Sequence, residues 1–374
     1  MDSLTRLETA WSFREPDRVP IELTISSLAR EQPEARRLAE FVDREADNFL
    51  YAPGFDWGFL GLDGQWSDEV IEEVPGAFKR IRHTVATPVG VFEAVTRHSH
   101  GELDPGDFAW ERRYIRSLED LERLAAAPRA PRAFNRAAWE EGVRQNGSRG
   151  ISGTGVFHPL GSLVRMSTME EVYGWFVAEP GLMHRFLDAT NRQAEASVLS
   201  LQGTGLRPVF YTWALEMLTP PWFGRRQFDE FVFPYDKRVN DAIHRVGARH
   251  RAHCHGNSGG FLERFADMGI DALEPLEPPP YGDNHLADAK RRVGRRMMLS
   301  GNILSQDYLR MSDAEIRDRV RAAIREGAPG GGFSLRCAGG DGSTGSAKDM
   351  DQLRSFIHGV GVYLDAALEF GSRA

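Results

Sequence analysis

The stretch Arg251-Ala252-His253-Cys254-His255-Gly256-Asn257 decides the fold, because it marks the end of a strand that follows directly on a helix. Apolar side chains at helical spacing run through residues 228–246 and stop at Gly247, with Pro234 predicted to kink this helix. Before the helix, residues 207–215 have the composition of a buried strand. A strand, a long helix and a second strand in this order are typical of a parallel sheet.

The same alternation continues on both sides of this unit. Further strands are expected at residues 19–24, 270–274, 297–300 and 333–337, with helices between them and a last helix near residues 350–360. Residues 150–157 are expected to be a strand or a loop. At least six such units and an N-terminal strand favour closure into a barrel over an open sheet. The predicted fold is therefore α/β, a single (β/α)8 TIM barrel with an N-terminal extension, in one domain covering residues 1–374.

The N-terminal third has weaker signals. A first helix is expected at residues 3–13 with Ser3 as its cap, and residues 85–95 have the pattern of a hairpin that turns at Pro88-Val89-Gly90. The segment at residues 127–132, rich in proline and arginine, is predicted to be a surface loop. The order of elements between residues 30 and 130 does not follow from the pattern.

Composition limits the classes of function. The chain has 374 residues, a formal net charge of −8, 41% hydrophobic and 27% charged residues. A negative net charge argues against nucleic acid as a partner, because phosphate binding needs a basic surface. No run of about 18 apolar residues predicts a membrane span. The two cysteines and an N-terminus without the apolar core of a signal peptide favour a cytoplasmic protein with free thiols.

Polar side chains, most of them ionisable, collect where the predicted strands end, and in a parallel barrel these ends meet at one mouth. The residues at these positions are Glu216, His253, His255, Glu274, Glu277, Asn302 and Cys337. On an extended strand His253 and His255 point the same way and Cys254 points the other way. Catalytic zinc sites use three protein ligands and leave one position open, so His253, His255 and Cys337 are one candidate set.

Each candidate also has a structural interpretation. The two histidines could instead be satisfied by hydrogen bonds, with Cys337 a small buried apolar side chain. Glu216 is a candidate for a further metal ligand or a general base, or else a carboxylate that begins a helix. Glu274 and Glu277 are candidates for acid/base catalysis, or else surface residues of a proline-rich loop.

Several stretches together resemble the uroporphyrinogen decarboxylase superfamily. They are Arg14-Glu15-Pro16-Asp17-Arg18-Val19-Pro20-Ile21, Thr87-Pro88-Val89-Gly90, residues 228–234, His253-Cys254-His255-Gly256-Asn257, Leu286-Ala287-Asp288-Ala289-Lys290 and Gly301-Asn302-Ile303. The resemblance spans nearly the whole chain and implies a single (β/α)8 barrel. Within the superfamily the chain is more similar to the methyltransferase branch, whose members bind zinc through an H-x-C pair and a later cysteine. Those enzymes pass methyl groups to or from a corrinoid or a thiol.

Two departures from the family pattern matter. True uroporphyrinogen decarboxylases carry an R-Q-A-G-R-Y segment after the first strand, and here residues 23–30 read Leu-Thr-Ile-Ser-Ser-Leu-Ala-Arg. His255 also stands where the methyltransferase pair would place cysteine, so only His253 and Cys337 match that pattern directly. A zinc ion held by two imidazoles and one thiolate is a stronger Lewis acid than one held by two thiolates and one imidazole.

The resemblance therefore implies a zinc-dependent, methyltransferase-like enzyme that demethylates a small methoxylated or methylated-amine substrate onto a corrinoid protein or a thiol. Zn²⁺ is expected on His253, His255 and Cys337, with Glu216 and Glu274 as catalytic residues. The alternatives are a metal-free decarboxylase or lyase that uses Glu216, Glu274 and His253 as acid/base groups, and a non-enzymatic ligand-binding barrel. A homodimer is a further expectation.

Overall fold

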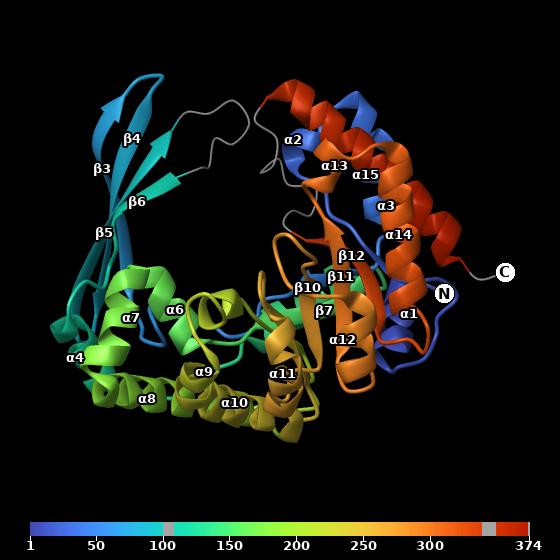
Figure 1. Ribbon diagram of the computed structural model, residues 1–374. Helices are drawn as coiled ribbons and strands as arrows, with labels where there is room; N and C mark the ends of the chain where they lie inside the picture. The colour runs from blue at the N-terminus through green and yellow to red at the C-terminus, as the bar shows by residue number, and fades with distance from the viewer. Residues whose placement is uncertain (100–107, 339–348, 373–374) are drawn as a thin grey trace.

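The computed structural model describes residues 1–99, 108–338 and 349–372. Its centre is an eight-stranded parallel sheet in the order β1-β12-β11-β10-β9-β8-β7-β2 (Figure 1). The strands are β1 (Ile21–Glu22), β2 (Asn48–Tyr51), β7 (Gly150–Gly155), β8 (Val209–Thr212), β9 (Arg249–His253), β10 (Ala272–Leu276), β11 (Met298–Leu304) and β12 (Phe333–Ala338). The Asn48 side chain bonds both backbone groups of Leu23 and so joins the two outer strands. The predicted α/β TIM barrel is confirmed.

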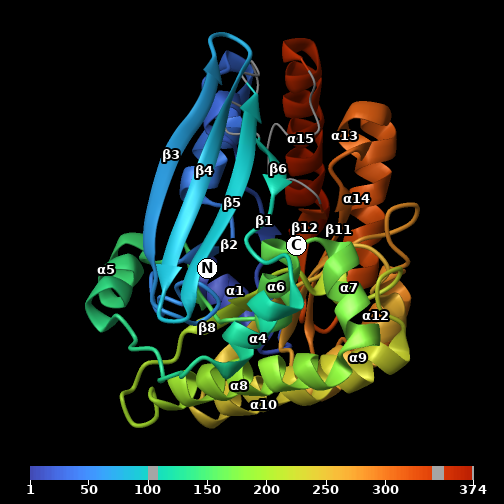
Figure 2. The same cartoon turned by 90° about the vertical axis from the view of Figure 1, so that its left-hand side faces the viewer.

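Helices connect the barrel strands and cover the outside of the sheet. They are α2 (Ser27–Arg30), α3 (Arg36–Arg44), α6 (Pro159–Met166), α7 (Met169–Ala178), α8 (Pro180–Leu199), α9 (Arg225–Phe231), α10 (Phe233–Arg245), α11 (Leu262–Met268), α12 (Leu286–Val293), α13 (Asp307–Arg310), α14 (Asp313–Gly327) and α15 (Met350–Gly371). The long helices α8 and α10 pack side by side below the sheet in both views (Figures 1 and 2). None of the helices described in these ranges is long and apolar enough to cross a membrane.

The first helix, α1 (Ser3–Trp11), packs against the N-terminal ends of the barrel strands. Its buried Leu7 and Trp11 form a cluster with Ile151, Val209 and Met298 from the strands. The cap of α1 is Asp2, whose carboxylate accepts a hydrogen bond from the Thr5 amide, and Ser3 is the first helical residue. The predicted cap was therefore one residue too late. Because α1 closes this end, the other end of the barrel is the one that can receive a ligand.

A second, antiparallel sheet stands beside the barrel (Figure 2). It consists of β3 (Gln65–Val74), β4 (Phe78–Thr87), β5 (Gly90–Ser99) and β6 (Phe108–Arg112), and the helices α4 (Leu118–Ala126) and α5 (Arg136–Asn146) follow it. The predicted hairpin is the β4–β5 pair, in which Thr87 faces Gly90. The strand β3 did not stand out in the sequence because it is charged and exposed along nearly its whole length.

Pro234 separates two helices instead of bending one. It lies in the first turn of α10, where the missing amide hydrogen breaks no helical hydrogen bond, and α9 ends at Phe231. The predicted strand at residues 207–215 is also shorter in the structure, because Ala214 adopts a left-handed conformation and a 3-10 turn follows at Leu215–Leu218. This turn carries Glu216.

The helix-facing side of β9 contains a buried histidine that makes stability depend on pH. Burial lowers the pKa of His250 to about 4, and the ring bonds the Thr212 hydroxyl. An unfolded histidine binds a proton below about pH 6.5, whereas folded His250 remains neutral until about pH 4. The unfolded state binds more protons in this window, so stability falls as the pH drops from about 6.5 to 4.

Urea unfolding of the wild type and His250→Gln at pH 7 and pH 4.5 measures this contribution. We expect the wild type to lose about 2–3 kcal/mol more than the variant between the two pH values, because the variant lacks the titrating ring. Equal losses in the two proteins would contradict the assignment.

Candidate active site

The inside of the barrel contains a buried cluster of opposite charges. Glu22 and Arg336 are register partners on β1 and β12, and Arg336 Nη1 lies 3.0 Å from Glu22 Oε2. Arg251 reaches Glu22 from β9, with its Nη2 at 2.6 Å from Oε2. Burial opposes ionisation of Glu22, but the charges of Arg251 and Arg336 and the Ser334 hydroxyl outweigh it and lower the pKa of this carboxyl group. Glu22 is therefore an anion in the interior.

Closer to the mouth of the barrel, the charged cluster continues to Glu274 and His253. Glu274 faces His253 in the register of β10 and β9, and Oε1 of Glu274 lies 2.9 Å from Nδ1 of His253. The other oxygen, Oε2, lies 2.9 Å from Arg336 Nε. Burial opposes ionisation, yet the Arg336 charge and the His253 hydrogen bond lower the pKa of Glu274. An ionised Glu274 accepts the Nδ1 proton of His253, which leaves Nε2 of that ring as the lone-pair nitrogen.

His255 has the same arrangement. Its Nδ1 lies 2.9 Å from Glu277 Oε1, and the second oxygen of Glu277 accepts the Gly256 amide at 2.6 Å. Burial lowers the pKa of His255, but the charges of Glu277, Glu216 and Glu274 outweigh it and raise the pKa above its ordinary value. The two imidazole rings are perpendicular neighbours, with centroids 4.5 Å apart. The predicted pairing of these histidines on one face is confirmed.

Glu216 lies close enough to His255 for its charge to raise the pKa of that ring. Its Oε2 atom is buried and has no hydrogen-bond partner among the residues that the structure describes. A buried carboxylate oxygen without a partner is costly, so the position favours a hydrogen-bond donor or a cation from outside the chain.

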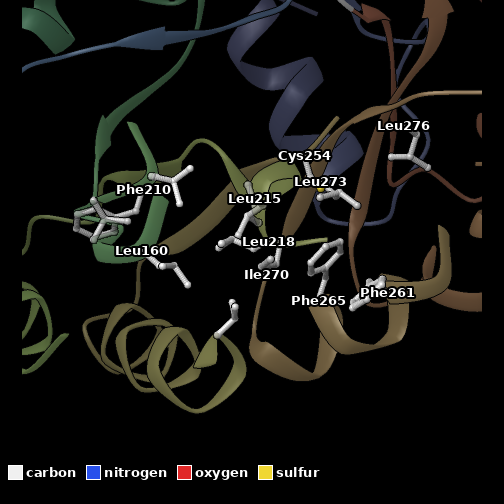
Figure 3. Packing of buried hydrophobic residues seen from close by; sticks show 14 of the residues in the cluster. Leu160, Phe210, Leu215, Leu218, Cys254, Phe261, Phe265, Ile270, Leu273 and Leu276 are labelled. Carbon is white, nitrogen blue, oxygen red and sulfur yellow. The ribbon is translucent and has the colours of Figure 1, made fainter. Parts of the chain in front are cut away.

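The structure does not bring Cys337 to the histidine pair. Cys337 follows Arg336 on β12, and because Arg336 points into the barrel, Cys337 points to the helix side. It is 3% exposed and lies against Tyr308 of α13. Cys254 is fully buried in the same helix-facing layer, among apolar side chains such as Leu273 (Figure 3).

His253 and His255 are arranged as metal-binding histidines are. The predicted set of three ligands, which includes Cys337, is not brought together. Metal-binding histidines commonly donate one ring N–H to a carboxylate, which holds the ring and directs the other nitrogen to the ion. His253 and His255 both do so. Within the described ranges, no three side chains of histidine, cysteine, aspartate or glutamate are grouped as a metal site. The histidine pair therefore fits a metal ion, and the thiol does not complete the site.

Three charged residues of this cluster were missed in the sequence. Glu22, Arg251 and Arg336 all lie on strands that were predicted, but only their neighbours were considered as site residues. Arg251 is two residues before His253, so it occupies the same face of β9. A charged side chain on the inward face of a predicted barrel strand was the signal that could have identified it.

The chain is a (β/α)8 barrel with ionisable groups gathered at its mouth. Residues 154–338 match the family model of uroporphyrinogen decarboxylase (URO-D). The chain belongs to the uroporphyrinogen decarboxylase superfamily.

Two curated relatives illustrate the distance within the superfamily. Uroporphyrinogen decarboxylase of Microcystis aeruginosa is 28% identical over 158 residues, which cover 41% of this chain and 42% of that protein. The enzyme of Cupriavidus necator is 33% identical over 159 residues, which cover 41% and 40%. The matched part thus spans less than half the length of these relatives.

A solved structure has a similar fold over almost the whole chain. A methyltransferase from Methanosarcina mazei superposes with a TM-score of 0.58, covering 99% of both chains at 16% sequence identity. At this identity the likeness establishes the fold alone.

Proposed function

We propose that this protein is a zinc-dependent, methyltransferase-like enzyme. It moves a methyl group between a small methylated substrate, a methoxy compound or an amine, and a corrinoid protein or a thiol. The observation that carries the proposal is the pair of imidazoles whose Nδ1 atoms are both held by carboxylates at 2.9 Å. This arrangement leaves the Nε2 atoms of both rings with free lone pairs, which can bind a metal ion at the mouth of the barrel.

Zinc in this site would be held by His253 and His255, and the charge of the nearby Glu216 would help to balance that of the ion. When bound, it would act as a Lewis acid that polarises an oxygen or nitrogen of the substrate. Glu274 and Glu277 hold the protons on the Nδ1 atoms and orient the two rings. Arg336 in turn holds Glu274 in place.

Membership of the superfamily and the fold shared with a methyltransferase support this proposal at a coarse level. In the methyltransferase branch a cysteine stands where this chain has His255. This difference in the metal ligands favours a demethylation reaction. A site with more neutral ligands keeps more positive charge on the metal, which favours activation of a leaving oxygen or nitrogen over activation of a bound thiolate.

The test is methyl transfer to free cob(I)alamin from a panel of methoxylated aromatics and methylated amines. Formation of methylcobalamin is followed by its absorbance. We expect transfer from at least one donor class, loss of transfer after chelation, and recovery on addition of zinc. His255→Ala should lower the rate by on the order of 100-fold. Transfer that is unaffected by chelators would overturn the zinc assignment, and no transfer from any donor would overturn the function.

A metal-free decarboxylase or lyase is the second candidate. It is favoured by the lack of a three-ligand group in the described part of the chain. In this case His253, oriented by Glu274, would serve as the acid/base group, and the buried arginines would attract a carboxylate. Release of carbon dioxide that is indifferent to chelators and depends on His253 would support this alternative.

A further inference from the structure

A cavity of about 200 Å³ opens where β7 and β8 end. Its walls come from the loop before β3, the end of β7, the helix α6 and the residues that follow β8. The lining residues used below are Trp57, Gly155, Phe157, Gly161, Arg165 and Trp213. The cavity lies at the end of the barrel opposite α1, which is the end where Glu274 and His253 lie.

Trp213 is the most unusual residue of the cavity because this large apolar residue is 47% exposed. Tyr211 pairs with Arg251 and Thr212 with Ala252, so Trp213 continues the inward face of β8 to the level of His253. The Tyr211 ring stacks on Trp213, with centroids 6.1 Å apart and planes at 25°. An exposed indole on the inward face of a barrel strand is available for stacking with a ligand.

The backbone after Trp213 is strained. Ala214 has φ +73°, a left-handed conformation that is unfavourable for a residue with a Cβ atom. This residue turns the chain directly after Trp213 and places Glu216 on the following turn. Strain kept at this position is typical of a site whose geometry serves binding or catalysis.

The remaining walls are flat and leave little room for added side chains. Trp57 stacks on Phe157, with centroids 5.7 Å apart and planes at 22°, and its Nε1 donates to the Gly155 carbonyl. A Cβ atom on Gly155 would lie 3.3 Å from the Trp213 ring, and one on Gly161 would lie 2.5 Å from His158 Nδ1. The glycines thus keep the cavity open between aromatic surfaces.

Positive charge borders this aromatic cavity. Arg165 is exposed at its edge, and no ion pair links it to a carboxylate in residues 1–99, 108–338 or 349–372. Arg113 lies beside it and donates to the Arg165 carbonyl oxygen. Burial, together with the charge of Arg165, lowers the pKa of Arg113. An anionic group on a ligand would relieve this repulsion.

We propose that this cavity binds a benzoate-sized aromatic carboxylate, with its ring stacked on Trp213 and its carboxylate paired with Arg165. Small ligand sites of this kind combine apolar aromatic walls with a few polar groups that fix orientation. The arrangement places the substituents of the ring beside His253. The inference rests on the proposed function, because it names the substrate class of the same site.

The test is isothermal titration of zinc-free protein with three probes, benzoate, benzamide and cyclohexanecarboxylate. Benzoate should bind best, because benzamide lacks the charge and cyclohexanecarboxylate lacks the flat ring. Trp213→Ala should weaken benzoate binding by about tenfold. Arg165→Gln should weaken benzoate by about three- to tenfold and leave benzamide unchanged.

Trp222→Ala is the matched control. Trp222 is also 47% exposed, but it stacks on Tyr173 and does not line the cavity. Its replacement should leave benzoate binding unchanged. No binding of benzoate to the wild type, or equal binding to the wild type and Trp213→Ala, would overturn the proposal.

The titration needs neither zinc nor a corrinoid, so its outcome is separate from that of the methyl-transfer assay. Benzoate binding that depends on Trp213, without methyl transfer from any donor, would support the cavity and overturn the proposed reaction. Methyl transfer without benzoate binding would support the reaction and overturn the aromatic carboxylate as its substrate class.

Discussion

Replacing Glu22 with alanine is expected to lower the free energy of unfolding by about 3–5 kcal/mol. Glu22 is the shared partner of Arg251 and Arg336, and its side chain is 1% exposed. Without it, two guanidinium groups remain in the barrel interior, and of these Arg336 still pairs with Glu274. Denaturant unfolding followed by circular dichroism measures the loss.

Glu22→Gln keeps the shape of the side chain and some of its hydrogen bonds, so its loss should be smaller than that of the alanine variant. Glu69→Ala is the exposed control, because Glu69 pairs with Arg82 at 3.0 Å and is 64% exposed. That change should cost at most about 1 kcal/mol. A loss below about 1 kcal/mol for Glu22→Ala would show that the cluster does not stabilise the barrel.

Replacing Glu277 with alanine is expected to weaken zinc binding by about 10–100-fold. Glu277 does not reach the ion in the proposed site, but it holds the Nδ1 proton of His255 and accepts the Gly256 amide. Without it, the ring loses its fixed tautomer and its orientation, and the loop after β9 loses a hydrogen bond. Competition with a colorimetric chelator at pH 7 gives the dissociation constant.

Glu263→Ala is the control for a carboxylate outside the site. Glu263 pairs with Arg292 and is 47% exposed, so its removal should leave the zinc affinity unchanged. Equal affinities of the wild type and Glu277→Ala would mean that Glu277 does not support a metal ligand. A parallel fall in the Glu263 variant would point to a general loss of stability.

The barrel could be predicted from the sequence because each of its units is local. A helical pattern between two apolar strands indicates a parallel sheet, and this pattern can be read without knowing which distant residues come into contact. The antiparallel sheet could not be predicted in this way. The acidic side chains of β3 form ion pairs with Arg80 and Arg82 of β4, and these residues come close only after the two strands have paired. Alternating charge without an apolar face carries no strand signal.

The site could be predicted in part for the same reason. The common face of His253 and His255 follows from strand geometry alone. The side of the sheet to which Cys337 points does not follow from strand geometry alone. It depends on which residues of β12 face into the barrel. Arg336 takes that position since Glu22 and Glu274 are there to pair with it, and both lie far away in the sequence.

The metal content of the purified protein tests the central claim most directly. Elemental analysis should find about one zinc per chain in the wild type and in Cys337→Ser, and none after His253→Ala or His255→Ala. The serine variant separates this account from the family pattern, because the thiol on the helix side of β12 holds no metal here. Absence of zinc from the wild type, or its loss in Cys337→Ser alone, would contradict the account.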